Sequence, residues 1–462
     1  MRTELLVVGA GPAGMAAAAA AAEGGVRVVL VDSGDRPGGQ YFRHTADGAS
    51  PNRDWAQYEL LAQRINAQQS RGNLTYLSRC AVWSLSDEGE HFVARLRKGE
   101  RTSDGIEVVA SHVVLATGAH DVALAFDGWD APGSMTVGGL QSLIKGQGLV
   151  AGKRIVIAGT GPFLLATAAD VLKYGGNVVA VVEAHSFTAL STNPFALLAG
   201  RHKIAQAVEL LGALRRAKTQ MIDHATVDAA LRSEDGSVCG VTVRTRRGSV
   251  EIDCDVIATG WGFEPNVELA VGLGLETFIP RGSGRVAVRV DDNQTSSHPR
   301  VWVAGELAGV AGSDVAIAEG EIAGNAAAQS LGRPEVSTTS ARHIRKRGRK
   351  FAEYLLWTYS VPPWWTRTLP DQTMLCRCEE VTVGEVRRVI EEYGAADSRA
   401  VKLFARVGMG WCQGRMCATN CADLIFDCTE VSNISTAAAA QKRTIASPIP
   451  LSMLAEWDSE TH

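Results

Sequence analysis

Four cysteines in the last part of the chain have a spacing that suits a metal centre. Cys376 and Cys378 have one residue between them, and Cys412 and Cys417 follow 33 residues later with four residues between them. Four thiolates in two close pairs are ligands for zinc or for an iron–sulfur cluster. Zinc ribbons prefer two residues between paired cysteines, so these gaps favour a cluster, with zinc and unligated thiols as the alternatives.

A glycine-rich turn near the N-terminus indicates a dinucleotide site. It reads Gly9-Ala10-Gly11-Pro12-Ala13-Gly14 and lies between an apolar run and an alanine-rich stretch. In such a turn the first glycine permits the tight bend, the second lets a pyrophosphate approach the backbone, and the third lets helix and strand pack closely. Asp32 ends the next apolar run 18 residues after Gly14, and its carboxylate suits a ribose diol and would repel a 2′-phosphate.

A second glycine-rich turn departs from this pattern at its last position. It reads Gly159-Thr160-Gly161-Pro162-Phe163-Leu164, and Glu183 ends the apolar run that follows. Leu164 replaces the third glycine, so we expect helix and strand either to be pushed apart there or to repack. Glu183 would favour an unphosphorylated ribose. NAD, ATP and a degenerate site without nucleotide are the alternatives for this position.

Apolar runs of strand length alternate with helical patterns around both turns. These runs are residues 4–9, 26–31, 111–117, 155–158, 178–182, 255–259 and 301–304. Such alternation is typical of an α/β fold with a parallel sheet. We predict two interleaved Rossmann-like dinucleotide-binding domains, with the second inserted into the first, because residues 301–304 best complete the N-terminal sheet.

The composition changes after residue 332, where a separate C-terminal part begins. Residues 341–350 hold seven basic side chains, which we interpret as a solvated helix face, with partner docking as the alternative. The predicted segments are 1–120 and 256–332 for the first domain, 121–255 for the inserted domain, 333–370 for a linker helix and arm, 371–430 for the cysteine module and 431–462 for an extended tail.

Several short motifs around the first turn resemble those of flavoproteins with two dinucleotide-binding domains, the glutathione-reductase-like and ferredoxin-reductase-like enzymes. They are Ser33, Gly39 and Gln40 after the acidic residue, Ala116-Thr117-Gly118 at the end of an apolar run, and Gly305-Glu306 after the last run. The resemblance covers residues 1–330 and implies FAD in the first site. This family usually has Gly-Asp where the chain has Gly305-Glu306, and we expect the longer carboxylate to reach the ribityl hydroxyls.

The cysteine module resembles the bacterioferritin-associated-ferredoxin-like (BFD-like) [2Fe-2S] domain. The resemblance lies in the stretch from Cys376 to Thr382 and in the stretch from Gly408 to Cys417. It implies that the four paired cysteines are the ligands of a [2Fe-2S] cluster. The glycines around the second pair suit a loop whose amides can point at sulfide.

The whole chain resembles the α (A) subunits of heteromeric FAD/[2Fe-2S] dehydrogenases for amines and imino acids. This family includes opine oxidase, D-hydroxyproline dehydrogenase, dye-linked L-proline dehydrogenase and hydrogen cyanide synthase. The resemblance implies electron transfer by this subunit, and oxidation of an amine, imino acid or opine by a flavoprotein β subunit. It also implies a respiratory electron acceptor, with a small γ subunit, FMN at a subunit boundary and ATP in the second nucleotide site left open.

Composition narrows the classes of protein that fit the chain. The net charge of −4 predicts no attraction to nucleic acid, and nine cysteines, an odd number, argue against a disulfide framework. We expect no membrane span and a cytoplasmic location, with peripheral membrane contact left open. His44 and His120 are single histidines near the flavin motifs, so we predict no acid–base set here. A stand-alone NADH-dependent ferredoxin-type reductase and a subunit with inert cofactors are the alternative functions.

Overall fold

The computed structural model describes residues 1–45, 54–99, 105–189, 201–362, 365–430 and 445–459. Its first β-sheet has the strand order β3-β2-β1-β6-β5-β4, and β19 pairs with the end of β6 on the side opposite β1. The strands are β1 (Arg2–Val8), β2 (Val28–Val31), β3 (Leu74–Leu77), β4 (Cys80–Asp87), β5 (Phe92–Lys98), β6 (Gly105–Leu115) and β19 (Val301–Val303). The pairing of β19 with β6 is parallel and completes this sheet as the sequence predicts.

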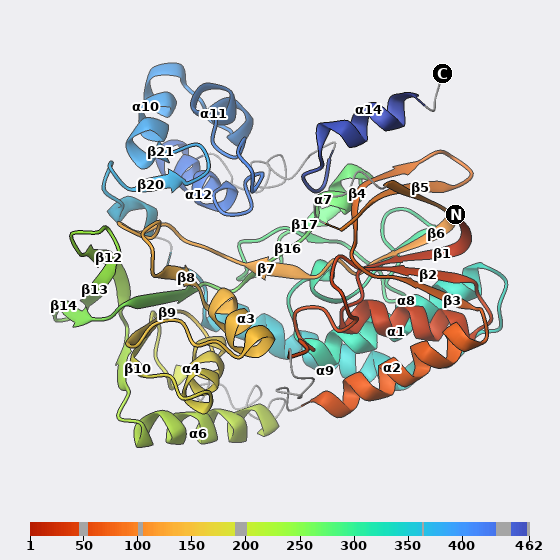
Figure 1. Cartoon of the computed structure of the whole chain (residues 1–462), viewed down its shortest axis with the longest axis horizontal. Coiled ribbons are helices and arrows are strands. Elements are labelled where there is room, and N and C mark those ends of the chain that lie inside the picture. The colour runs from red at the N-terminus through yellow and green to blue at the C-terminus, as the bar shows by residue number, and fades with distance from the viewer. Residues whose placement is uncertain (46–53, 100–104, 190–200, 363–364, 431–444, 460–462) are drawn as a thin grey trace.

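Two helices pack against one face of the first sheet, and their backbones approach each other very closely. They are α1 (Pro12–Glu23) and α8 (Ser313–Ser330), with α2 (Trp55–Ser70) and α9 (Thr339–Thr358) on the same side (Figure 1). A Cβ on Gly320 or Gly324 of α8 would overlap a carbonyl oxygen of α1, so these positions allow the backbones to touch. The alanines of α1 are nearly all buried for the same reason.

The first sheet is mixed, because β5 runs antiparallel to β4 and β6, and a second sheet that is parallel throughout lies beside it. Its strands, in the order β11-β10-β9-β15-β8, are β11 (Gln220–Asp223), β10 (Val178–Glu183), β9 (Ile155–Gly159), β15 (Val256–Gly260) and β8 (Ser134–Thr136). Helices α3 (Val137–Gln147), α4 (Phe163–Lys173) and α6 (Arg201–Arg216) accompany it, together with an antiparallel sheet of β12 (Thr226–Arg232), β13 (Val238–Thr245) and β14 (Gly248–Asp253). Both sheets follow one α/β plan, so the predicted fold class is confirmed.

Short strands connect the two sheets. β7 (Ala119–Asp121) leaves the first sheet and pairs antiparallel with β16 (Phe263–Pro265), which returns from the second. The smaller elements that follow are α7 (Glu268–Gly272), β17 (Thr277–Phe278), β18 (Ala287–Val288) and the 3-10 helix η2 (Gly305–Ala308). This crossing places residues 117–121 next to residues 263–266.

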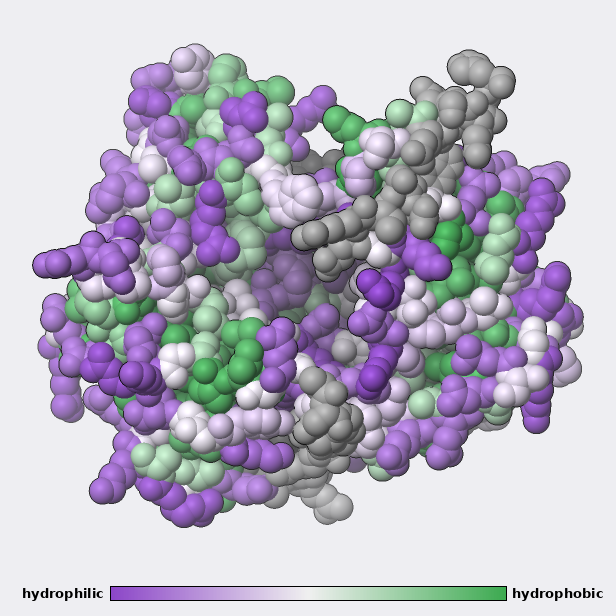
Figure 2. Space-filling model, in the orientation of Figure 1, coloured by the Kyte–Doolittle hydropathy of each residue, from purple (hydrophilic) through white to green (hydrophobic). Residues whose placement is uncertain are grey.

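The C-terminal module forms a separate lobe over the β7–β16 pair (Figure 1). It contains η3 (Trp365–Thr368), β20 (Met374–Cys376), β21 (Val381–Thr382), α10 (Val383–Tyr393), α11 (Ser398–Ala405) and α12 (Ala418–Thr429), and α14 (Leu451–Ser459) follows nearer the chain end. Figure 2 shows that this face is hollowed at its centre, between this lobe and the first sheet. Within the described ranges, no helix is long and apolar enough to cross a membrane.

Candidate functional site

The first glycine-rich turn joins β1 to α1 and packs against the end of β6. Gly9 has a φ of +99°, and a Cβ on this residue would overlap the carbonyl oxygen of Ala116. A Cβ on Gly14 would overlap the carbonyl oxygen of Gly9. Gly11 is different, because no described atom lies within 4 Å of the position its Cβ would take. The turn is therefore closed toward the sheet and open at the residue that would face a pyrophosphate.

Two other predicted segments lie directly against this turn. A Cβ on Gly39 would lie 2.9 Å from the Cα of Gly11, so this second turn passes over the first at backbone distance. A Cβ on Gly305 would lie 2.8 Å from the Cβ of Ala13 in the first turn of α1. The structure thus brings together three glycine segments that are far apart in the sequence.

Asp32 lies on the first turn as its position at the end of β2 requires. Its two carboxylate oxygens accept hydrogen bonds from the amides of Ala10 (2.6 Å) and Gly34 (2.7 Å). The Asp32 side chain stays partly exposed, and Ser33 and Gln40 are exposed beside it. All three predicted contact residues are therefore at least partly accessible to a ligand.

Asn266 holds the Ala116-Thr117-Gly118 segment, and no sequence motif marked this residue. Its Nδ2 donates to the carbonyl oxygen of Thr117 (2.8 Å), and its backbone N–H donates to that of Gly118 (3.0 Å). Its Oδ1 lies 2.9 Å from Nδ1 of His120 on β7. Nε2 of His120 is buried and has no hydrogen-bond partner in the part of the chain that the structure describes. Buried polar atoms are normally paired, so Nε2 suits a hydrogen bond to a bound group.

The carboxyl of Glu306 closes the loop before α8. Its Oε1 accepts from the amides of Gly312 (3.0 Å) and Ala311 (3.4 Å). Burial is the main influence on this carboxyl and raises its pKa. Gly305, the residue before it, donates its N–H to Oε2 of Glu319 (3.0 Å). The motif that resembles Gly-Asp is thus fixed from both sides.

Glu319 is a fully buried acid in α8 that the sequence did not single out. Nε and Nη2 of Arg349 donate to its two carboxylate oxygens, each at 2.8 Å, and Nε of Arg345 lies 3.4 Å from Oε1. Nη1 of Arg349 also donates to the carbonyl oxygen of Gly309 (2.6 Å). The interpretation of residues 341–350 as a solvated face is therefore wrong for these two arginines. They bind α9 to the flavin motif, because an uncompensated carboxylate could not be buried in α8.

The second glycine-rich turn is repacked around Leu164 rather than opened. Helix α1 begins at Pro12, whereas α4 begins at Phe163, one position later in the motif. Leu164 is fully buried and joins a hydrophobic cluster with Val137. A Cβ on Gly260 would lie 3.2 Å from Cδ2 of Leu164, so the leucine fills the space between the helix and the end of β15.

Glu183 faces its own glycine turn from the end of β10. Its carboxylate accepts from Oγ1 of Thr160 (3.1 Å) and from the amides of Gly161 (2.9 Å) and His185 (3.0 Å). Gly159 ends β9 next to this turn. Burial raises the pKa of the Glu183 carboxyl to about 7, against the lowering effect of these hydrogen bonds. The side chain is 2% exposed.

The four predicted cysteine ligands lie together in the C-terminal module. Cys376 and Cys417 are each 1% exposed, Cys412 is half-buried, and Cys378 is exposed. Their thiols are within hydrogen-bonding reach in a chain of three pairs, which are Cys376–Cys417, Cys417–Cys412 and Cys412–Cys378. Among the described residues, no group of three or more acidic, His or Cys side chains has the arrangement for a single metal ion.

The electrostatic environment favours the thiolate at two of the four cysteines. Interaction with Cys417 lowers the pKa of Cys376 to about 6 and that of Cys412 to about 4, whereas the pKa of Cys417 is raised in return and burial raises that of Cys378. The amide of Gly408 donates to the sulfur of Cys376, and that of Gly414 donates to the sulfur of Cys412. Thiolates are the form that binds metal, so these donors fit a cluster, as the loop sequence predicts.

A five-residue segment, 264–268, connects the cysteine module to the flavin motifs; we call it the bridge. At its first position, Glu264 accepts a hydrogen bond from Oγ1 of Thr419 in α12 (2.7 Å). At its last position, Oε1 of Glu268 lies 2.8 Å from Nη2 of Arg415. In the sequence, Arg415 lies between Cys412 and Cys417. The middle residue is Asn266, which holds the Thr117-Gly118 turn. One short segment therefore touches both sites.

Comparison with known families agrees with this geometry. Residues 3–334 match the model described as pyridine nucleotide-disulphide oxidoreductase, and residues 374–426 match the model described as BFD-like [2Fe-2S] binding domain. The chain belongs to the pyridine nucleotide-disulphide oxidoreductase family. As a member of this family with a BFD-like domain, it is a flavin-dependent oxidoreductase with an iron–sulfur domain.

Relatives in this family match almost the whole chain. The opine oxidase A subunit of Rhizobium meliloti (strain 1021) is 31% identical over 93% of this chain and 93% of its own length. Hydrogen cyanide synthase subunit HcnB of Pseudomonas aeruginosa is 30% identical over the full length of both. The solved structure of L-proline dehydrogenase from P. horikoshii has the same fold, with a TM-score of 0.70 and 17% identity over 98% of this chain and 79% of that one.

The residues of the first site fit the FAD that the family implies. Gly11 leaves backbone exposed where a pyrophosphate would approach, and Asp32 is placed for a ribose. The N-terminus of α1, which directly follows, favours negative charge. The four cysteines and the amides directed at them fit a [2Fe-2S] cluster.

Proposed function

We propose that this chain is the electron-transferring flavin and iron–sulfur subunit of a heteromeric dehydrogenase that oxidises a C–N bond. The substrate would be an amine, imino acid or opine, oxidised on a partner β subunit that is itself an FAD-dependent oxidase-like protein. The electrons would then pass from this subunit to a respiratory acceptor. The bridge supports this most directly, because it joins both redox sites within one chain.

The residues of this chain would bind and orient the two groups. When bound, FAD exchanges electrons singly or in pairs, and a [2Fe-2S] cluster exchanges them one at a time. The turn at Gly11 would receive the pyrophosphate, and Asn266 fixes the Thr117-Gly118 turn beside it. The amides near Cys376 and Cys412 would hold the cluster thiolates.

The histidines near the flavin motifs suit a subunit whose substrate site lies elsewhere. Nε2 of His44 lies 2.9 Å from the carbonyl oxygen of Pro37, and Nδ1 of His120 lies 2.9 Å from Oδ1 of Asn266. The two rings are therefore engaged separately. One relative is named as a subunit of opine oxidase, which supports an opine as the class of substrate. The compounds that we propose to test are octopine, nopaline, proline, hydroxyproline and glycine. We also propose that FMN binds at the subunit boundary and that the complex contains a small γ subunit. The complex would contact a membrane only peripherally.

The test is anaerobic reduction of the purified chain with and without its co-purifying partner. We expect the flavin and cluster absorption to bleach when the partner and one of these substrates are both present. Neither component alone should produce bleaching. Bleaching of the isolated chain by NADH would instead identify a stand-alone reductase. The flavin, iron and subunit content of the same preparation decides whether FMN and a γ subunit belong to the complex.

A further inference from the structure

The second glycine turn is covered by the chain itself at the residue that is open in the first turn. Beside Gly161, the position of a Cβ lies 3.7 Å from Cβ and 3.8 Å from Cγ of Tyr359. Beside Gly11, the equivalent position has no described atom within 4 Å. A pyrophosphate approaches the backbone at this glycine, so Tyr359 stands where the phosphates of a dinucleotide would bind.

Polar contacts fix the covering segment, residues 359–360, to the turn. Oγ1 of Thr160 lies 3.3 Å from the carbonyl oxygen of Tyr359 and shares its one proton between that oxygen and the carboxylate of Glu183, and Nε2 of His185 lies 2.7 Å from the carbonyl oxygen of Ser360. The rings of His185 and Tyr359 pack edge to face, with centroids 6.0 Å apart. The covering segment therefore uses a hydroxyl of the turn and the side chain that directly follows β10.

The acidic residue of the second site is also engaged within the protein. Glu183 is 2% exposed and accepts three hydrogen bonds from its own turn and from the residues after β10. Asp32, its counterpart in the first site, stays partly exposed. A ribose at the second site would have to displace these internal donors from a buried carboxylate, which costs free energy.

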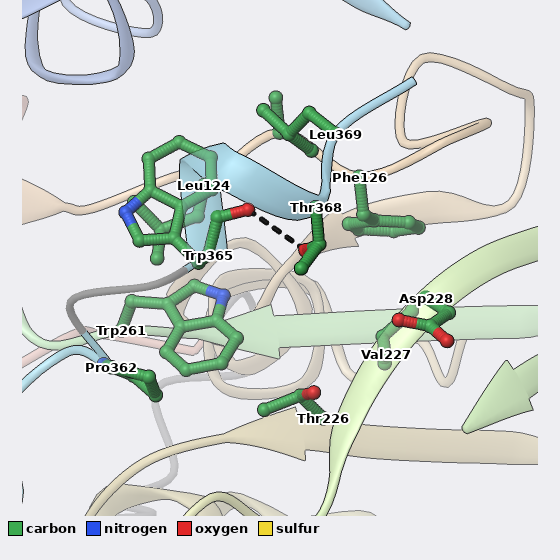
Figure 3. Close-up of a pocket in the computed structure, with 11 residues that line it drawn as sticks. Leu124, Phe126, Thr226, Val227, Asp228, Trp261, Pro362, Trp365, Thr368 and Leu369 are labelled. Carbon is green, nitrogen blue, oxygen red and sulfur yellow. Dashed lines mark hydrogen bonds between the residues drawn. The ribbon is translucent and has the colours of Figure 1, made fainter. Parts of the chain in front are cut away.

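The chain on each side of the covering segment is anchored. Before it, α9 is bound to α8 through Arg349 and Glu319, and the backbone of Trp357 packs on Gly282, where a Cβ would lie 2.8 Å away. After it, the chain enters the pocket of Figure 3, where Pro362 lies beside the ring of Trp261. Trp365, Thr368 and Leu369 of the arm line the same pocket with Leu124 and Phe126.

We infer that residues 359–360 are the resident ligand of the second nucleotide cradle, so that the cradle binds the arm of the cysteine module instead of NAD or ATP. The residues there do not fit a nucleotide, because the open glycine and the partly exposed carboxylate of the first site are both missing. The cradle serves as the attachment point of the arm between α9 and the module.

Nucleotide binding to the full-length protein tests this inference, with NAD⁺ and ATP as probes in equilibrium dialysis. The wild type should bind neither at about 1 mM, the range of the weakest specific ligands. Tyr359→Gly, which removes both side-chain atoms that lie over Gly161, should gain affinity for at least one probe by roughly tenfold or more. Tyr393→Ala, which alters an exposed tyrosine on the cysteine module, is the matched control and should behave as wild type.

Two results would overturn the inference. Micromolar binding of either probe by the wild type would show that the cradle is open. Failure of both wild type and Tyr359→Gly to bind would place the exclusion in the turn itself. If Tyr359→Gly does not fold, hydrogen–deuterium exchange on the wild type decides: the amides of residues 359–361 should be protected with and without the probes. Loss of that protection on adding nucleotide would count against the arm as ligand.

Discussion

Arg415 and Glu268 form an ion pair, with Nη2 2.8 Å from Oε1, between the cysteine loop and the first residue of α7. The Glu268 side chain is 5% exposed, so its charge depends on Arg415 for compensation. Nη2 of Arg415 also donates to the carbonyl oxygen of Ala446 (2.8 Å). The loop with two cluster ligands is thereby fixed two residues from Asn266, which holds the flavin turn.

The substitution Arg415→Met should weaken the attachment of the cysteine loop to the bridge, while both FAD and the cluster stay bound. The variant leaves Glu268 buried and unpaired, and we expect unfolding to become easier by roughly 2–3 kcal/mol, because Arg415 itself is partly exposed. Electron transfer between flavin and cluster should slow, as followed by stopped-flow reduction. Arg289→Met, which breaks an exposed pair with Glu276, is the control and should cost at most about 1 kcal/mol. An unchanged transfer rate in Arg415→Met would contradict the role of the bridge.

Gly11→Val should produce a folded protein that does not bind FAD. No described atom occupies the space of the new side chain, and the backbone at Gly11 has a φ of −70°, which other residues adopt. The valine would block the pyrophosphate. Gly14→Val is the contrasting variant, because its Cβ would overlap the carbonyl oxygen of Gly9 and so should impair folding itself. Circular dichroism and flavin content distinguish the two outcomes, and FAD bound to Gly11→Val would refute the site.

Arg349→Met should destabilise the protein by about 3–5 kcal/mol, because it leaves the fully buried Glu319 without its bidentate partner. Lys350→Met alters the exposed neighbour and should have little effect. Combining Glu319→Leu with Arg349→Leu should restore part of the loss, since apolar replacement of a buried ion pair is often neutral. Denaturant unfolding measures all three. If Arg349→Met is as stable as wild type, the ion pair between Arg349 and Glu319 contributes nothing to the stability of the fold.

Local motifs predicted the tight packing of the first turn because Gly9 and Gly39 are required by close backbone approaches. Gly11 is the exception, since its Cβ would meet no described atom, and its role for a ligand stays a prediction. Asn266 and Glu319 could not be predicted, because an isolated Asn after a strand and a Glu in an alanine-rich helix have no pattern of their own. Their roles depend on tertiary contacts with Thr117 and Arg349.

The second site shows the same limit for a different reason. The departure at Leu164 was visible, but its outcome depended on where α4 begins, and the structure shifts that start by one residue. The cover by Tyr359 was not visible at all, since it depends on the path of the arm after α9. The basic run was recognised, yet only the fold reveals that Arg345 and Arg349 face Glu319.

Cys412→Ser should remove the cluster signal while FAD stays bound. Cys412 is half-buried and is within hydrogen-bonding reach of two other ligand thiols. Its loss would leave the cluster with three of its four predicted cysteine ligands. Cys428→Ser, in the exposed end of α12, is the control and should retain the signal. Electron paramagnetic resonance of the reduced protein reports the cluster, and absorption reports the flavin. A normal [2Fe-2S] spectrum in Cys412→Ser would overturn the ligand assignment.

Glu183 should make the protein less stable as the pH rises from about 4.5 to about 7. Its pKa is about 7 in the folded protein against an ordinary value of 4.5, so in this window the folded state binds more protons than the unfolded state. The free energy of unfolding therefore falls as pH rises, by up to about 3 kcal/mol, and levels off above pH 7. Glu183→Gln does not titrate, and the difference in stability between variant and wild type should change across this window. The amide of the variant lowers the free energy of unfolding at every pH, because one backbone N–H then faces an NH₂ group. This loss does not depend on pH, so the change of the difference with pH reflects only the protonation of Glu183. Urea unfolding at a series of pH values measures it, and parallel curves for the two proteins would show that Glu183 keeps an ordinary pKa.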